Sequence, residues 1–226
     1  MYRMTSAMNH ATTAPLNTLS GPTVFVVDDD ISVRESLELL IGSAGWRPIL
    51  FDSAQAFLSA TPNAGPSCLV LDVNMPGLNG LDLQSLITKS GNRTPIIFVS
   101  GFGDVPMTVK ALKGGALDFL TKPIDAEALL AAIQSALSQS EALIRDEEEL
   151  MRLQVCYDAL TPREREVMSG VVKGLLNKQV AFELDISEIT VKAHRGQVMR
   201  KMSARSLPDL VNMAAKLRID DGREIH

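Results

Sequence analysis

The stretch Cys68-Leu69-Val70-Leu71-Asp72-Val73-Asn74-Met75-Pro76-Gly77 decides the fold of the first half of this 226-residue chain. An apolar run ends on one carboxylate, and a Pro-Gly turn follows within a few residues. Apolar runs of this length, bounded by turn signals, are typical of buried central strands. Ligands of open α/β sheets bind outside the carboxyl ends of the strands. Asp72 is therefore expected at the edge of a sheet, either as a reactive group or as a plain cap of the strand end.

Strand and helix patterns alternate on both sides of this stretch. Apolar runs predict strands at 24–27, 49–51, 69–71, 96–99 and 118–121, and helical periodicity predicts helices that begin near 32, 54, 81, 105 and 125. Five β–α repeats over about 120 residues predict an α/β domain, a five-stranded parallel sheet covered by helices on both faces.

Polar residues follow four of the predicted strands. Asp28 and Asp29 follow the first, Asp72 ends the third, Ser100 ends the fourth and Lys122 follows the fifth. The carboxyl ends of parallel strands meet at one edge, so these side chains are expected to lie together. Clustered carboxylates repel one another unless a cation is present. A hard divalent ion such as Mg²⁺ removes that cost and prefers oxygen ligands.

Residues from about 23 to 140 resemble the receiver domain of two-component response regulators, which has a flavodoxin-like fold. The motifs that carry the resemblance are Val27-Asp28-Asp29-Asp30, Asp72-Val73-Asn74-Met75-Pro76-Gly77, Val99-Ser100-Gly101 and Lys122-Pro123. They occur in order and at the family's spacing.

The resemblance implies that Asp72 accepts a phosphoryl group. It also implies that Asp29 and Asp72 ligate Mg²⁺ through carboxylates, Asn74 through its backbone carbonyl and Asp28 through a water molecule. Phosphoryl transfer needs an in-line nucleophile and compensation for charge on the equatorial oxygens. Mg²⁺ and Lys122 would supply that compensation.

Two further residues match the family's switch pair. The Ser100 hydroxyl would contact the phosphoryl group, and the ring of Phe119 would turn inward. Plain core packing is the alternative for Phe119. Asp30 is expected as a charge at a helix N-terminus rather than as a metal ligand, and Pro123 suggests a cis peptide after Lys122.

The second half of the chain predicts a small all-α domain of four helices. Thr161 suits an N-cap, Pro162 the first helical position and Glu164 the matching position of a capping box. Helices are predicted at 178–184, 188–202 and 207–217. Two short helices joined by a tight turn, the second one basic, are typical of a helix-turn-helix. Residues 187–205 hold five Lys and Arg against one Glu, which indicates phosphate contact or a solvated helix face.

Residues 158–219 resemble the LuxR-type DNA-binding domain. The matching strings are Leu160-Thr161-Pro162-Arg163-Glu164-Arg165-Glu166 and Thr190-Val191-Lys192-Ala193-His194-Arg195. The residues expected to contact DNA are Lys178, Thr190, Lys192, Ala193, His194, Arg195, Gly196, Arg200 and Lys201. Ala193 and Gly196 are expected nearest the base edges. His194 is open between a phosphate donor and a packed core residue.

The predicted organisation is a disordered leader (1–22), a receiver domain (23–140), a helical linker (141–157), a LuxR-type domain (158–219) and a tail (220–226). No apolar run is long enough to span a bilayer. The two cysteines make no disulfide framework and suit a reducing compartment. We therefore expect a cytoplasmic protein with no membrane partner.

These expectations combine into a transcriptional response regulator of the FixJ/NarL family, a non-enzyme in a phosphorelay. Its expected partners are a sensor histidine kinase, promoter DNA, RNA polymerase and, on phosphorylation, a second copy of the chain. Two alternatives stay open. One is a DNA-binding regulator that works without phosphorylation. The other is a phosphohydrolase with Asp72 as nucleophile. Such an enzyme is expected to have a second Asp two residues later, where this chain has Asn74, and this alternative leaves residues 158–219 unexplained.

Overall fold

The structure is a computed structural model that describes residues 21–60, 65–101 and 105–219. The chain divides into two compact units, Met1–Glu141 and Ala142–His226. The predicted tail and all but the last two residues of the predicted leader lie outside the described residues. None of the helices in the described ranges is long and apolar enough to cross a membrane.

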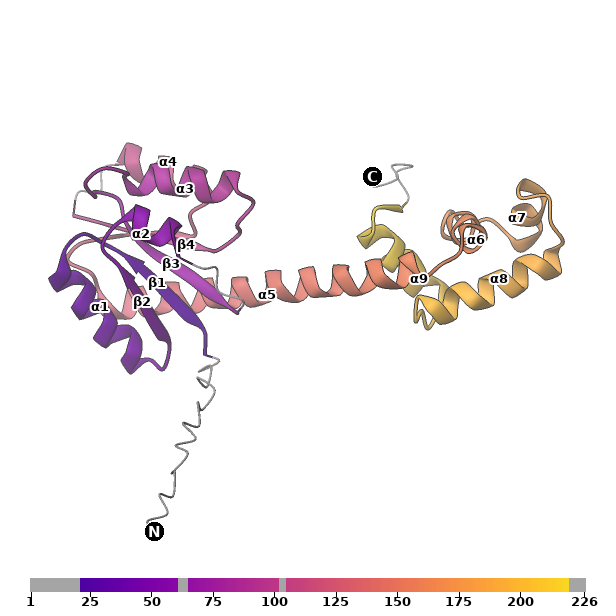
Figure 1. Ribbon diagram of the computed structural model, residues 1–226, viewed down its shortest axis with the longest axis horizontal. Coiled ribbons are helices and arrows are strands. Elements are labelled where there is room, and N and C mark those ends of the chain that lie inside the picture. Colours follow the sequence, from indigo (N-terminus) through magenta and orange to yellow (C-terminus); the bar gives the residue numbers. More distant parts are fainter. Residues whose placement is uncertain (1–20, 61–64, 102–104, 220–226) are drawn as a thin grey trace, which may run out of the picture. The chain divides into compact units, whose positions relative to one another are not determined.

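The first unit is built on a five-stranded parallel sheet (Figure 1). Its strands are β1 (Thr23–Val27), β2 (Arg47–Phe51), β3 (Ser67–Asp72), β4 (Ile96–Ser100) and β5 (Asp118–Thr121), in the order β2-β1-β3-β4-β5. All four strand pairs are parallel, which confirms the predicted fold class. Strand β2 begins two residues before the predicted 49–51 because its Pro48 lies on an edge strand, where a missing N–H is tolerated.

Helices cover both faces of the sheet. They are α1 (Ile31–Ser43), α2 (Ala54–Leu58), α3 (Gly80–Lys89), α4 (Val105–Lys113) and the first part of α5 (Ala126–Asp158). Helices α1 and α5 lie on one face of the sheet, and α2, α3 and α4 lie on the other (Figure 1). Their buried side chains form one core on each face. Side chains of β3 alternate between the two cores: Cys68 and Val70 face α1 and α5, and Leu69 and Leu71 face α3.

The two cysteines are free thiols, as expected. Cys68 is fully buried in β3, and this burial raises the pKa of its thiol to about 12. A thiol with so high a pKa is not a nucleophile at neutral pH.

The second unit is helical. It contains the last part of α5, followed by α6 (Pro162–Val172), α7 (Asn177–Glu183), α8 (Glu188–Lys201) and α9 (Leu207–Lys216). The largest fully buried side chains of its core are Met168 of α6, Leu210 of α9 and Met202 at the end of α8. Thr161 and Glu164 form the predicted capping box at the start of α6. Helix α5 is continuous through residues 141–157, where a helical linker was expected.

Candidate functional site

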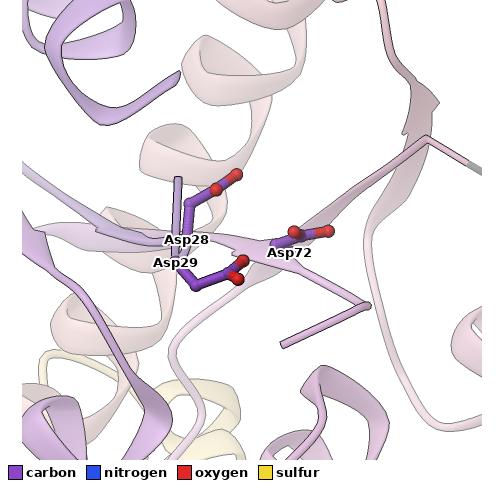
Figure 2. Close-up of side chains that lie close together, drawn as sticks. All are labelled: Asp28, Asp29 and Asp72. Carbon is purple, nitrogen blue, oxygen red and sulfur yellow. The ribbon is translucent and has the colours of Figure 1, made fainter. Parts of the chain in front are cut away.

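Three carboxylates meet at the carboxyl edge of the sheet. Asp28 and Asp29 follow β1, and Asp72 is the last residue of β3. One ligand oxygen from each lies within 4.8 Å of those of the other two (Figure 2). Asp28 is 1% exposed and Asp72 4%, whereas Asp29 is exposed. The strand register explains why Asp28 and Asp72 lie together, because Val27 pairs with Leu71 and each of these residues is followed by an aspartate.

Lys122, which follows β5, completes this edge. Its Nζ lies 2.7 Å from Oδ2 of Asp28 and 3.2 Å from Oδ2 of Asp72. Burial raises the pKa of Asp72, although the backbone N–H of Asn74 and the charge of Lys122 oppose that rise. Burial acts to lower the pKa of Lys122, but hydrogen bonds and charges from Asp28 and Asp72 outweigh it and raise that pKa. Lys122 is therefore a fixed cation beside the Asp72 carboxylate.

Asn74 connects Asp72 to β4. Its backbone N–H donates to Oδ1 of Asp72 (3.3 Å), and its side-chain amide donates to the Ser100 hydroxyl (3.2 Å). Ser100 is fully buried at the end of β4. The structure thus brings Ser100 to the same cluster, with Asn74 between it and Asp72.

Phe119 lies in β5 and is half-buried. Its ring centroid is 6.3 Å from that of Phe98 in β4, and it packs on the core beneath α3 and α4. A rotation of this ring on phosphorylation stays a prediction.

Two smaller predictions are confirmed beside the site. Asp30 lies at the helix terminus as expected, since it is the N-cap of α1 and its carboxylate accepts a hydrogen bond from the backbone N–H of Ser32 (2.8 Å). The Lys122–Pro123 peptide bond is cis, as expected.

Two residues of this site were not predicted from the sequence. Arg34 of α1 donates to the backbone carbonyl of Asp28 (2.7 Å). Gly80 begins α3 against the backbone of β3, and a Cβ at this position would lie 2.3 Å from the carbonyl oxygen of Asp72. Asn79 is the N-cap of α3, a signal that could have placed the helix start at Gly80 rather than at the predicted residue 81. Nothing local predicted the close approach to Asp72.

The donor set fits a divalent cation. Three clustered carboxylates face the single ammonium group of Lys122 among the contacts described, so a further positive charge would relieve their repulsion. Oxygen donors at this spacing suit Mg²⁺.

We expect the substitution Asp29→Asn to weaken Mg²⁺ binding by at least about 10-fold, because the loss of an outer-shell partner alone typically costs roughly 10- to 100-fold and Asp29 is expected to be a direct ligand. Titration calorimetry on the full chain measures it. The matched control is Asp30→Asn, which changes the neighbouring carboxylate but keeps an N-cap residue at the start of α1. Equal affinities in the two variants would contradict the assignment of Asp29.

The candidate DNA-binding helices have an exposed face and an inner face. Val191 and Val198 hold α8 to the domain core. The side exposed to solvent carries Lys192, Ala193, Gly196 and Arg200 of α8, and Lys178 of α7 is exposed as well. Thr190 and His194 are half-buried, and the Thr190 and Ser187 hydroxyls hydrogen-bond at 2.7 Å.

Two of the basic residues of α8 that are expected to contact DNA have partners outside that helix. Lys201 donates to the buried carboxylate of Glu164 (2.7 Å) and to the carbonyl of Ala159 (3.1 Å). Arg195 donates to the side-chain carbonyl of Asn177 (3.0 Å). DNA contact by Lys201 and Arg195 stays a prediction, but each would have to share or leave these partners.

The Lys201–Glu164 pair gives a titration prediction. The hydrogen bond from Lys201 lowers the pKa of Glu164, and the backbone N–H of Thr161 lowers it further. Because the pKa of Glu164 is lower in the folded state than in the unfolded one, its ionised carboxylate stabilises the fold. This contribution is complete above the ordinary glutamate pKa of about 4.3. It is lost as the pH falls through the folded value. We expect Lys201→Met to raise the pKa of Glu164, measured by carboxyl NMR titration. An unchanged midpoint would contradict this account of the pair.

Comparisons with known proteins match both units. The response regulator receiver domain matches residues 24–134, and the domain of the bacterial regulatory proteins of the luxR family matches residues 158–214. Nodulation protein W of Bradyrhizobium diazoefficiens is 48% identical over 196 residues, which are 87% of this chain and 86% of that protein. The chain belongs to the two-component response regulators with a LuxR-type DNA-binding domain.

This response regulator is also similar to transcriptional regulatory protein FixJ of Bradyrhizobium diazoefficiens, with 44% identity over 193 residues, 85% of this chain and 94% of that protein. Among solved structures, response regulator StyR is 45% identical, covers 87% of this chain and 99% of its own, and has a TM-score of 0.77. Full-length FixJ from B. japonicum is 43% identical, covers 88% and 98%, and has a TM-score of 0.53. The predicted family, the fold class and the function of a transcriptional response regulator are confirmed.

Proposed function

We propose that this response regulator is switched by phosphorylation of Asp72, which a sensor histidine kinase carries out with Mg²⁺ at the site. The observation that supports this most is the position of Asp72. Its carboxylate is buried at the end of the central strand, 3.2 Å from the ammonium of Lys122 and beside two further carboxylates. A solvated strand cap would have no need of this arrangement.

The residues divide the work of phosphoryl transfer among them. An oxygen of Asp72 attacks the phosphorus of the donor phosphohistidine in line with the P–N bond, which breaks as the acyl phosphate forms. Asp29, Asp72 and the backbone carbonyl of Asn74 would hold Mg²⁺, with Asp28 acting through a water molecule, and the ion would supply positive charge to neutralise the transferring group. Lys122 supplies a positive charge 3.2 Å from the Asp72 carboxylate, at little reorganisation cost because its ammonium group is already held by Asp28.

The signal leaves this site through β4 and β5. The Ser100 hydroxyl, held by the Asn74 side chain, is expected to donate to a phosphoryl oxygen, and Phe119 on the neighbouring strand is expected to follow it inward. The changed surface then favours a homodimer. Two copies of α8 can occupy half-sites one DNA turn apart, and the bound dimer acts on RNA polymerase in the cytoplasm, as a regulator rather than as an enzyme with turnover.

Selection from a random DNA pool tests this function. The full chain is incubated with Mg²⁺, with or without acetyl phosphate, and the bound sequences are recovered at fixed salt, because affinity for DNA depends strongly on salt. We expect a paired half-site to be enriched only with acetyl phosphate. Equal enrichment in both samples would support the regulator that works without phosphorylation, and no enrichment in either would contradict sequence-specific DNA binding.

A further inference from the structure

Helix α8 carries an isoleucine whose side chain does not pack into the domain core. Ile189 lies in the first turn of α8 (Glu188–Lys201) and is 80% exposed. Burial of an isoleucine side chain stabilises a folded protein, and an isoleucine this exposed contributes almost none of that stabilisation. The side chain therefore has apolar surface available for another molecule.

Ile189 begins a ridge along the outer face of the helix. Ile189, Ala193, Gly196 and Arg200 recur at helical spacing on the side opposite Val191 and Val198, which pack into the core. All four are exposed, and nothing lies within 4 Å of a Cβ added at Gly196. The first three have no side-chain donor or acceptor, so they cannot read a base edge by hydrogen bonds.

Charges around the ridge decide what can cover it. Lys192 and Arg200 are exposed on the same helix and Lys178 on α7. Lys192 pairs with the carboxylate of Glu188, 3.4 Å from its Nζ. Cations beside a narrow apolar ridge complement a surface of phosphates with an apolar group between them. The major groove of DNA is such a surface, because thymine presents its 5-methyl group there. The first turn of a recognition helix is the part that contacts base edges.

We infer that Ile189 contacts the 5-methyl group of a thymine and so sets a preference for an A·T pair at one position of each half-site. This inference rests on the proposed DNA binding and names a specificity-determining residue within it. The contact is apolar, so the thymine is recognised by its methyl group and not by its O4 acceptor.

Replacement of thymine by uracil tests the contact, because it removes the methyl group and keeps every hydrogen-bonding atom. In a site selected by the phosphorylated full chain, each thymine is replaced singly by deoxyuridine. We expect one replacement per half-site to weaken wild-type binding about fourfold, the value for one buried methyl group. The variant Ile189→Ala should bind the thymine site less tightly and bind the thymine and uracil sites equally.

The control is Leu39→Ala in α1, which truncates a 77% exposed leucine far from the helix-turn-helix in sequence. It should retain the wild-type response to uracil. If every single uracil site binds wild type as tightly as thymine, or if Ile189→Ala keeps the same uracil penalty, the inference is wrong while DNA binding stands. If wild type selects no sequence from the pool, the proposed function itself fails.

Discussion

Asp72→Asn is expected to abolish phosphorylation of this protein while leaving it folded. The amide has the shape of the carboxylate but is not a nucleophile, and no other described carboxylate is both buried at the end of the central strand and in contact with Lys122. Burial and the neighbouring Asp28 both act to raise the pKa of Asp72, so the ionised carboxylate destabilises the metal-free fold. The Asn variant should therefore unfold at an equal or higher temperature than wild type at neutral pH.

Intact mass after incubation with acetyl phosphate and Mg²⁺ measures the effect. Wild type should gain one phosphoryl group, and Asp72→Asn none. Asp52→Asn is the matched control, because Asp52 follows β2 at the same edge of the sheet but is exposed and bonded only to the Ser53 hydroxyl among the contacts described. A phosphoryl group that persists on Asp72→Asn would place the acceptor elsewhere. Loss of the adduct in Asp52→Asn would show that the assay responds to the whole edge and not to Asp72.

The positions of Asp28, Asp72 and Lys122 could be predicted from sequence because each follows an apolar run, and parallel strands end at one edge. The sequence did not predict that β1 lies directly beside β3, the pairing that brings Asp28 next to Asp72. The pairing of Lys201 with Glu164 could not be predicted, because it joins residues of α6 and α8 whose approach depends on how the helices pack. The local sequence around a basic residue in a recognition helix does not show that its side chain is already paired with a carboxylate elsewhere in the domain.

Gly80 shows the same limit, since a tight backbone approach leaves only a glycine in the sequence. We expect Gly80→Ala to lower the free energy of unfolding by about 1–3 kcal/mol, the usual cost of overpacking. The added Cβ would lie 2.3 Å from the Asp72 carbonyl oxygen and 3.0 Å from the Val73 Cα. These are backbone atoms of the central strand and its exit, so they cannot rotate away as a side chain does.

Gly80→Ala should also lower the rate of phosphorylation, because the end of β3 that the new methyl group displaces carries the nucleophile Asp72. A misplacement of about 1 Å can cost roughly 100-fold in rate, so a smaller shift of Asp72 should slow phosphorylation by acetyl phosphate about tenfold. Denaturant unfolding and the rate of mass gain measure the two effects on the same protein. Gly42→Ala in α1 is the control: nothing lies within 4 Å of its added Cβ, and alanine in place of glycine in an exposed helix should stabilise by about 0.5–1 kcal/mol. A Gly80→Ala variant as stable and as reactive as Gly42→Ala would mean that α3 can move away from β3 without disturbing Asp72, and that Gly80 has no part in positioning the site.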